Sequence, residues 1–85
     1  MNDNNDHNRP EATATNRLVG GRIRRAFADA GISDDVAAEM LGQSTEVLNE
    51  MLDGRIRCAP LVLYLIAEAT NKSIVWFFGG DSAAK

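Results

Sequence analysis

The side chains that could carry chemistry in this 85-residue sequence are mostly charged, and the types needed for catalysis are scarce. Cys58 is the only cysteine and His7 the only histidine. A lone cysteine excludes an internal disulfide and fits a reducing compartment, so we interpret it as filling a small apolar space. The sequence offers no Ser/His/Asp set, no glycine-rich loop after a strand and no ligand cluster for a metal. We therefore expect no enzymatic activity, no catalytic residues, no metal and no cofactor.

The charged residues separate into two groups along the chain. Six acidic residues and no basic residue lie between Asp34 and Asp53, whereas arginines gather before and after that segment. The net charge is −3, although a protein that binds nucleic acid usually carries a positive excess. The positions of these charges in the fold therefore bear directly on function.

Helices must position these charges, because apolar residues recur at helical spacing through most of the chain. The pattern predicts helices over 16–30, 34–41, 45–53, 60–70 and 74–78, in a domain that covers 16–80. Serine precedes three of them as an N-cap, and glycine follows where a helix should end. These capping residues are Ser33, Ser44 and Ser73, and the terminating glycines are Gly31, Gly42 and Gly54.

The two glycines Gly20 and Gly21 are expected to weaken the first turn of the first helix. The same helical spacing predicts the apolar faces of the first three helices. The expected inward residues are Leu18, Val19, Ile23, Ala26, Phe27 and Ala30, then Val36, Ala37, Met40 and Leu41, and then Val47, Leu48, Met51 and Leu52.

Two further segments are interpreted from composition. Residues 1–15 are predicted to be a disordered tail, because they contain almost no large apolar side chain, and 81–85 a short C-terminal tail. Residues 61–66 are apolar throughout and could form a buried strand. We favour a helix, because Pro60 suits a first helical position, Ala67–Ala69 continues in helix-forming residues, and no partner strand exists elsewhere. The predicted fold class is therefore all-α.

The segment from Leu18 to Gly80 resembles the phage-repressor (Cro-type or XRE) helix-turn-helix family without a gap. Each matching piece is weak alone, but seven occur in order at the right separations over about three-quarters of the chain. The pieces are Arg22-Ile23-Arg24-Arg25, Gly31-Ile32-Ser33, Ala38-Glu39-Met40-Leu41-Gly42, Ser44 to Gly54, Arg55-Ile56-Arg57, Ile66-Ala67-Glu68-Ala69 and Ser73-Ile74-Val75-Trp76-Phe77-Phe78.

The resemblance implies a five-helix, lambda-repressor-like bundle in which 34–41 and 45–53 form the DNA-reading unit, with the second helix in the major groove. It implies base-facing positions at the start and outer side of that helix and arginines that contact the DNA backbone. The base-facing positions are Ser44, Thr45, Glu46, Asn49 and Glu50, and the phosphate contacts are Arg22, Arg25, Arg55 and Arg57. The alternative for the arginines is a solvated face or pairing with the acidic helices.

The acidic segment departs from the family pattern, because relatives carry neutral or basic donors where this chain has Asp34, Asp35, Glu46 and Glu50. A glutamate can accept from cytosine, but carboxylates that face phosphates repel them. Two hypotheses follow. The chain is a DNA-binding transcriptional regulator, acting as a homodimer, or it is a degenerate acidic helix-turn-helix that regulates another protein by binding it.

The helix over 60–70 is apolar on every side for nearly two turns, which predicts self-association. The expected dimer interface is formed by Leu61, Tyr64, Leu65, Trp76, Phe77 and Phe78. The alternative is that the last helix and the tail fold over this surface.

No segment has the features of a signal peptide or the length to span a bilayer, so we expect a cytoplasmic protein without a membrane partner. No ligand pocket is expected either, because the sequence shows no sensor domain beyond the helical unit.

Overall fold

The computed structural model describes residues 13–80, and these residues form five helices and no strand. The helices are α2 (Ala14–Ala30), α3 (Asp34–Leu41), α4 (Thr45–Leu52), α5 (Pro60–Thr70) and α6 (Ile74–Phe77). The all-α prediction is confirmed, and the segment over 61–66 is helical rather than extended. Residues 1–12 and 81–85, and with them His7 and most of the predicted tails, lie outside the described residues.

Side-chain caps decide where four of the helices begin. The hydroxyls of Ser33, Ser44 and Ser73 accept hydrogen bonds from backbone N–H groups three residues later, at 3.1–3.3 Å, as the sequence predicts. Thr13 does the same for the N–H of Asn16 at 3.0 Å, so α2 begins at Ala14, two residues before the predicted start. Residues 13–15 therefore belong to the first helix and its cap rather than to a tail.

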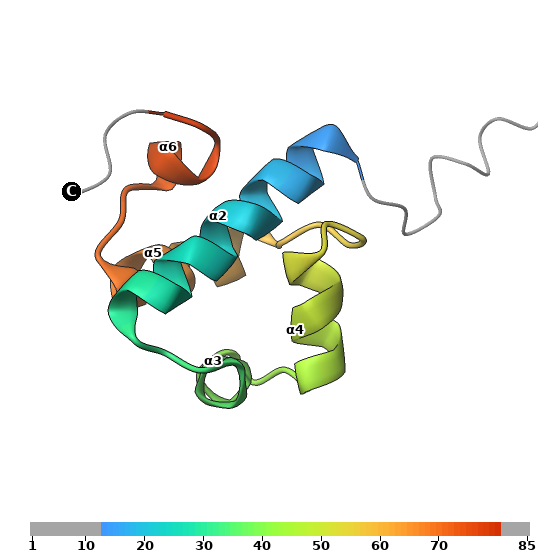
Figure 1. Ribbon diagram of the computed structural model, residues 1–85, viewed down its shortest axis with the longest axis vertical. Helices are drawn as coiled ribbons and strands as arrows, with labels where there is room; N and C mark the ends of the chain where they lie inside the picture. The colour runs from blue at the N-terminus through green and yellow to red at the C-terminus, as the bar shows by residue number, and fades with distance from the viewer. Residues whose placement is uncertain (1–12, 81–85) are drawn as a thin grey trace, which may run out of the picture.

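Helix α2 is the centre of the arrangement. It packs against α4, α5 and α6, while α3 contacts α4 and α5 contacts α6. In Figure 1, α2 runs diagonally across the molecule, with α6 on one side of it and α3 and α4 on the other, and α5 passes behind it. The core that this arrangement encloses is built on four side chains with almost no exposed area, Ile23, Leu48, Ile66 and Phe77.

Gly20 lies at a close contact between the backbones of α2 and α4. A Cβ atom at Gly20 would lie 2.4 Å from the carbonyl oxygen of Leu52 and 2.7 Å from that of Met51. Gly20 is also buried, whereas a Cβ atom at Gly21 would meet nothing within 4 Å. The sequence suggests only that these glycines weaken the helix, but the first of them is what allows the two helices to touch.

The predicted inward face of α3 is partly wrong. Val36 and Met40 are 48% and 45% exposed, while Ala37 and Ala38 occupy the core side. Leu41 is half-buried against the core. Small alanines let the short α3 approach the core closely, and its larger side chains then fall on the opposite side, four residues apart. Leu18, Ala30 and Val47 are also exposed, contrary to expectation.

Candidate nucleic-acid interface

Helices α3 and α4 are joined by a tight glycine turn. Gly42 has φ +67°, in the left-handed region, and closes α3 by donating its N–H to the carbonyl of Glu39 at 3.2 Å. Gln43 donates its N–H to the carbonyl of Ala38 at 2.9 Å, and Ser44 then caps α4. The chain therefore passes from α3 into α4 through only three residues, a connection of the length found in helix-turn-helix units.

The turn leaves one side of α4 in contact with solvent. Leu48, Met51 and Leu52 are buried, and the remaining positions of α4 are exposed. All five residues predicted to face bases lie on this exposed side, which we call the outer face of α4: Ser44, Thr45, Glu46, Asn49 and Glu50.

Most carboxylates of α3 and α4 have no ion-pair partner among residues 13–80. Asp53 accepts from the guanidinium of Arg24 at 3.1 Å, with both side chains about half exposed. The other five acidic residues of the segment are exposed and make no ion pair within residues 13–80, namely Asp34, Asp35, Glu39, Glu46 and Glu50. Asp34, Asp35 and Glu46 lie in first helical turns, where a negative charge complements the free N–H groups. Glu39 and Glu50 have no such local explanation.

The arginines predicted to contact phosphate occupy different surroundings. The guanidinium of Arg22 lies 4.9 Å from the ring centre of Trp76, and the ammonium of Lys72 lies 4.7 Å from the same ring. This contact gives Arg22 a role inside the fold. Arg25, Arg55 and Arg57 are exposed and make no ion pair in the part of the chain described.

The two loop arginines follow α4 directly. The N–H of Arg55 donates to the carbonyl of Glu50 at 2.9 Å, which holds the loop against the last turn of the helix. Arg57 is two residues further on and lies beside Thr15 and Asn16 of α2. Arg25 is on α2, more than two turns after Asn16, so it is well separated from Arg57 along that helix.

Apolar side chains accompany the acidic ones on this unit. Val36 and Met40 lie on the exposed side of α3, and Val47 on α4 is 37% exposed. Val47 and Ile56 also line an open groove beside the carboxylates of Glu46 and Glu50. The sequence predicts the charges of this surface but not these apolar residues, because helical spacing assigns Val36 and Met40 to the core.

The residues of the predicted dimer interface are divided between the surface and the core. Leu61, Tyr64, Leu65 and Phe78 are exposed, with Leu61 the most exposed of the four at 69%. Trp76 and Phe77 are buried, and their rings pack edge to face at 5.1 Å, so these two residues belong to the core and not to an interface. Both residues lie on the four-residue helix α6, which packs against α2 and α5, and this packing buries both rings. Ile74 and Val75 are exposed instead.

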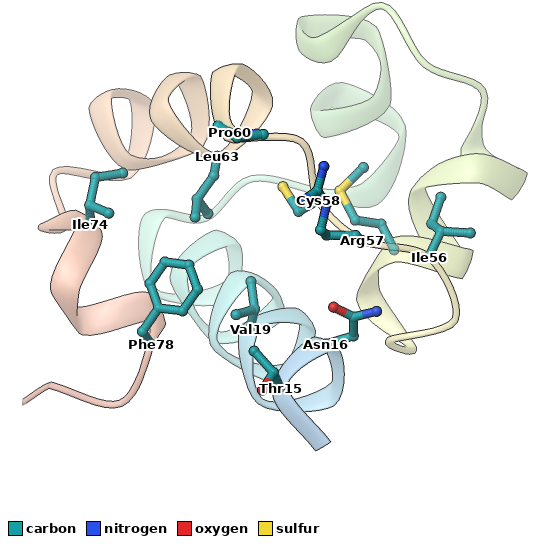
Figure 2. Close-up of a pocket in the computed structure, with 11 residues that line it drawn as sticks. Thr15, Asn16, Val19, Ile56, Arg57, Cys58, Pro60, Leu63, Ile74 and Phe78 are labelled. Atoms are coloured by element: carbon teal, nitrogen blue, oxygen red, sulfur yellow. The ribbon is translucent and has the colours of Figure 1, made fainter. Parts of the chain in front are cut away.

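A cavity of about 270 Å³ lies between the start of α2, the 53–59 loop, the start of α5 and α6 (Figure 2). Its wall is mainly apolar and includes Cys58, and burial raises the pKa of the Cys58 thiol from 9.0 to about 11. The side chain is therefore a neutral thiol near neutral pH, as expected for a cysteine in an apolar space. The expectation that the fold holds no pocket is wrong, because the walls come from four segments whose closeness no local pattern reveals.

Within the described range, no three or more His, Cys, Asp or Glu side chains are arranged to hold a metal ion. None of the five helices is both long enough and apolar enough to cross a membrane.

Comparison with protein-family models gives no match, and comparison with curated proteins also gives none. The features that bear on function are therefore the geometry of α3 and α4, the arginines that flank them and the sequence motifs.

Proposed function

We propose that this protein is a DNA-binding transcriptional regulator of the phage-repressor helix-turn-helix type. The observation that carries the proposal is the outer face of α4, which follows a three-residue glycine turn and is flanked by the exposed Arg55 and Arg57. A helix held in this way has the width and the freedom on one side to enter a major groove.

In this proposal the arginines supply the affinity and α4 supplies the sequence preference. Arg25, Arg55 and Arg57 contact phosphates, because each is exposed and has no ion pair with another residue of the described range. Arg22 is left out of this set, because its guanidinium stacks on Trp76. Thr45 and Asn49 offer neutral groups to base edges, and Glu46 or Glu50 can accept from the amino group of a cytosine.

The five unpaired carboxylates make nonspecific binding weak. Unit charges a few ångströms apart near a protein surface interact by roughly 1–4 kcal/mol, so several carboxylates near phosphates oppose the arginines. A protein with this balance binds DNA only where direct base contacts add to the phosphate contacts. Association as a homodimer through the exposed apolar residues of α5 and α6 doubles the arginines at one operator and fits a two-fold symmetric site.

The test is selection from a pool of random duplexes, followed by affinity measurements between about 50 and 200 mM salt. A site-specific complex is expected, whose affinity falls steeply with salt. The double variant Arg55→Gln with Arg57→Gln should make the slope of log affinity against log salt concentration shallower by about two. Each lost phosphate contact lowers the steepness of this slope by about one. Arg24→Gln is the matched control, since Arg24 is already paired with Asp53. Absence of binding at the lowest salt would reject the proposal.

A second function is favoured by the apolar side chains on the acidic unit. Val36, Met40 and Val47 are exposed among unpaired carboxylates, a combination that suits a basic, amphipathic protein surface better than a polyanion. Under this alternative the unit docks on another protein and regulates it. Met40→Gln separates the two functions, because it should leave DNA affinity within about twofold and lower affinity for a protein partner at least tenfold, as loss of a buried anchor does.

A further inference from the structure

The cavity beside the start of α2 has the composition of a small-molecule site. Val19, Met51, Leu63, Ile74 and Phe78 contribute apolar atoms, and Figure 2 shows these side chains, where labelled, around one space together with those of the loop. Its uncharged and charged polar lining residues are Thr15, Asn16 and Arg57, beside the thiol of Cys58. An apolar wall with a small number of polar groups at one side is the general design of a ligand pocket.

The space lies between side chains of residues 13–80, and its wall is mainly apolar. An apolar cavity without an apolar occupant leaves its wall atoms short of contacts, which costs stability. A ligand from outside the chain would supply those contacts.

Volume and charge define the class of ligand. A cavity of about 150 Å³ accommodates benzene, so about 270 Å³ accommodates roughly ten to twelve non-hydrogen atoms. Arg57 is exposed, lines the cavity and makes no ion pair within residues 13–80. Guanidinium groups bind carboxylates through two parallel hydrogen bonds.

We propose that this cavity binds a small amphipathic carboxylic acid, with an apolar body of about eight carbons among the apolar side chains and its carboxylate on Arg57. Asn16 lines the same cavity, and in this proposal its amide donates to the second carboxylate oxygen. The ligand site follows from the cavity alone. Its consequence for regulation rests on the proposed function: Arg57 cannot hold a carboxylate and a DNA phosphate at once, so the acid weakens DNA binding and DNA weakens binding of the acid.

The binding test uses octanoate, which has about ten non-hydrogen atoms, with 1-octanol and butyrate as comparisons. Calorimetric titration without DNA should give a sub-millimolar Kd for octanoate and at least tenfold weaker binding of butyrate. Arg57→Gln should weaken octanoate at least tenfold and change octanol by less than about twofold. Arg55→Gln is the matched control, because it removes the same charge from the same loop but does not line the cavity. An equal loss in both variants, or no octanoate binding, overturns the proposal.

The location of the ligand is tested separately, through the native thiol. Octanoate should slow the modification of Cys58 by an aromatic disulfide reagent, because both occupy the same cavity. Ile74→Trp, which enlarges a half-exposed wall residue, should abolish both octanoate binding and this protection. If Ile74→Trp does not fold, the protection of Cys58 in the unaltered chain still decides: octanoate that binds without slowing the reaction is bound elsewhere, and the proposal fails.

The regulatory arm measures affinity for the selected DNA with and without saturating octanoate. Octanoate should lower the DNA affinity of the unaltered chain about fivefold, because it displaces one phosphate contact. It should not change the DNA affinity of Arg57→Gln. Octanoate binding without any DNA binding rejects the proposed function and keeps the ligand site. DNA binding without octanoate binding rejects the ligand site, and binding of both without mutual effect rejects the regulation.

Discussion

The two sides of α2 use charge differently. Toward α6, cations are held inside the fold: Arg22 and Lys72 lie on Trp76, and Lys72 also pairs with Asp29 at 3.3 Å. Toward α4 and the α3 beyond it, Asp53 is paired, and the other carboxylates of the acidic segment have no ion pair within the described chain. Charges on the α6 side are explained by the packing they support. On the α3–α4 side, Glu39 and Glu50 support no such packing and lie outside the first helical turns, so their explanation is sought in a binding partner.

The largest expected effect on stability comes from the close contact between α2 and α4 at Gly20. Gly20→Ala should destabilise the fold by about 3 kcal/mol or more, because its Cβ would lie 2.4 Å from a backbone carbonyl that cannot move alone. Gly21→Ala is the control and should stabilise by up to about 1 kcal/mol, since the space there is open and alanine favours a helix. Urea unfolding measures both. Equal effects would show that α2 and α4 are not in close contact.

The next effect tests whether the cations of the α6 side support packing. Arg22→Gln should lower stability by about 0.5–1 kcal/mol through loss of its contact with the Trp76 ring. The same change in a Trp76→Leu background should cost much less, because the quadrupole that attracts the cation is gone. A double-mutant cycle by urea unfolding gives the coupling, and a value near zero would mean that Arg22 is merely a solvated charge.

Cys58, in the wall of the cavity, predicts that the stability of the fold falls at alkaline pH. The pKa of Cys58 is raised from 9.0 to about 11, so the folded state disfavours the thiolate more than the unfolded chain does. The contribution of Cys58 to the free energy of unfolding is fully present below pH 9, and it is lost as the pH rises toward 11. The loss should be about 1 kcal/mol once solvent screening of this partly exposed side chain is allowed for. Cys58→Ala should remove this decline from thermal unfolding measured between those pH values.

The smallest effect on stability, and the sharpest test of the α3–α4 side, comes from Glu50. It lies in the second half of α4, where a negative charge opposes the helix dipole. Glu50→Gln should stabilise the fold by about 0.3 kcal/mol and strengthen nonspecific DNA binding several-fold at low salt, with the gain fading as salt rises. Unchanged DNA affinity at low salt would show that the outer face of α4 does not approach phosphates.

Local patterns in the sequence identify the helices well and their packing less well. Ser33, Ser44 and Ser73 cap helices as predicted, because capping depends on residues three apart. Val36 and Met40 are assigned to the wrong side, since an eight-residue helix has too few turns for periodicity to choose between neighbouring faces.

The candidate site was predictable as a set of exposed residues on α4, but its surroundings were not. The roles of Gly20 and Arg22 and the existence of the cavity depend on residues 30 to 60 positions away in the chain, which no local pattern relates. The same limit explains why Trp76 and Phe77 are assigned to an interface, because aromatic side chains suit an interface and a core equally.

Helix α6 has four residues, which is too short to persist in water by itself. Its shape therefore lasts only while the aromatic rings remain seated against α2, and Ile74 and Phe78, which wall the cavity, flank those rings. Undocking of this one turn would open the cavity and strip Trp76, the only tryptophan, of both cations at once. The intrinsic fluorescence of the protein is thus a direct gauge of how often that side of the molecule opens, ahead of unfolding as a whole.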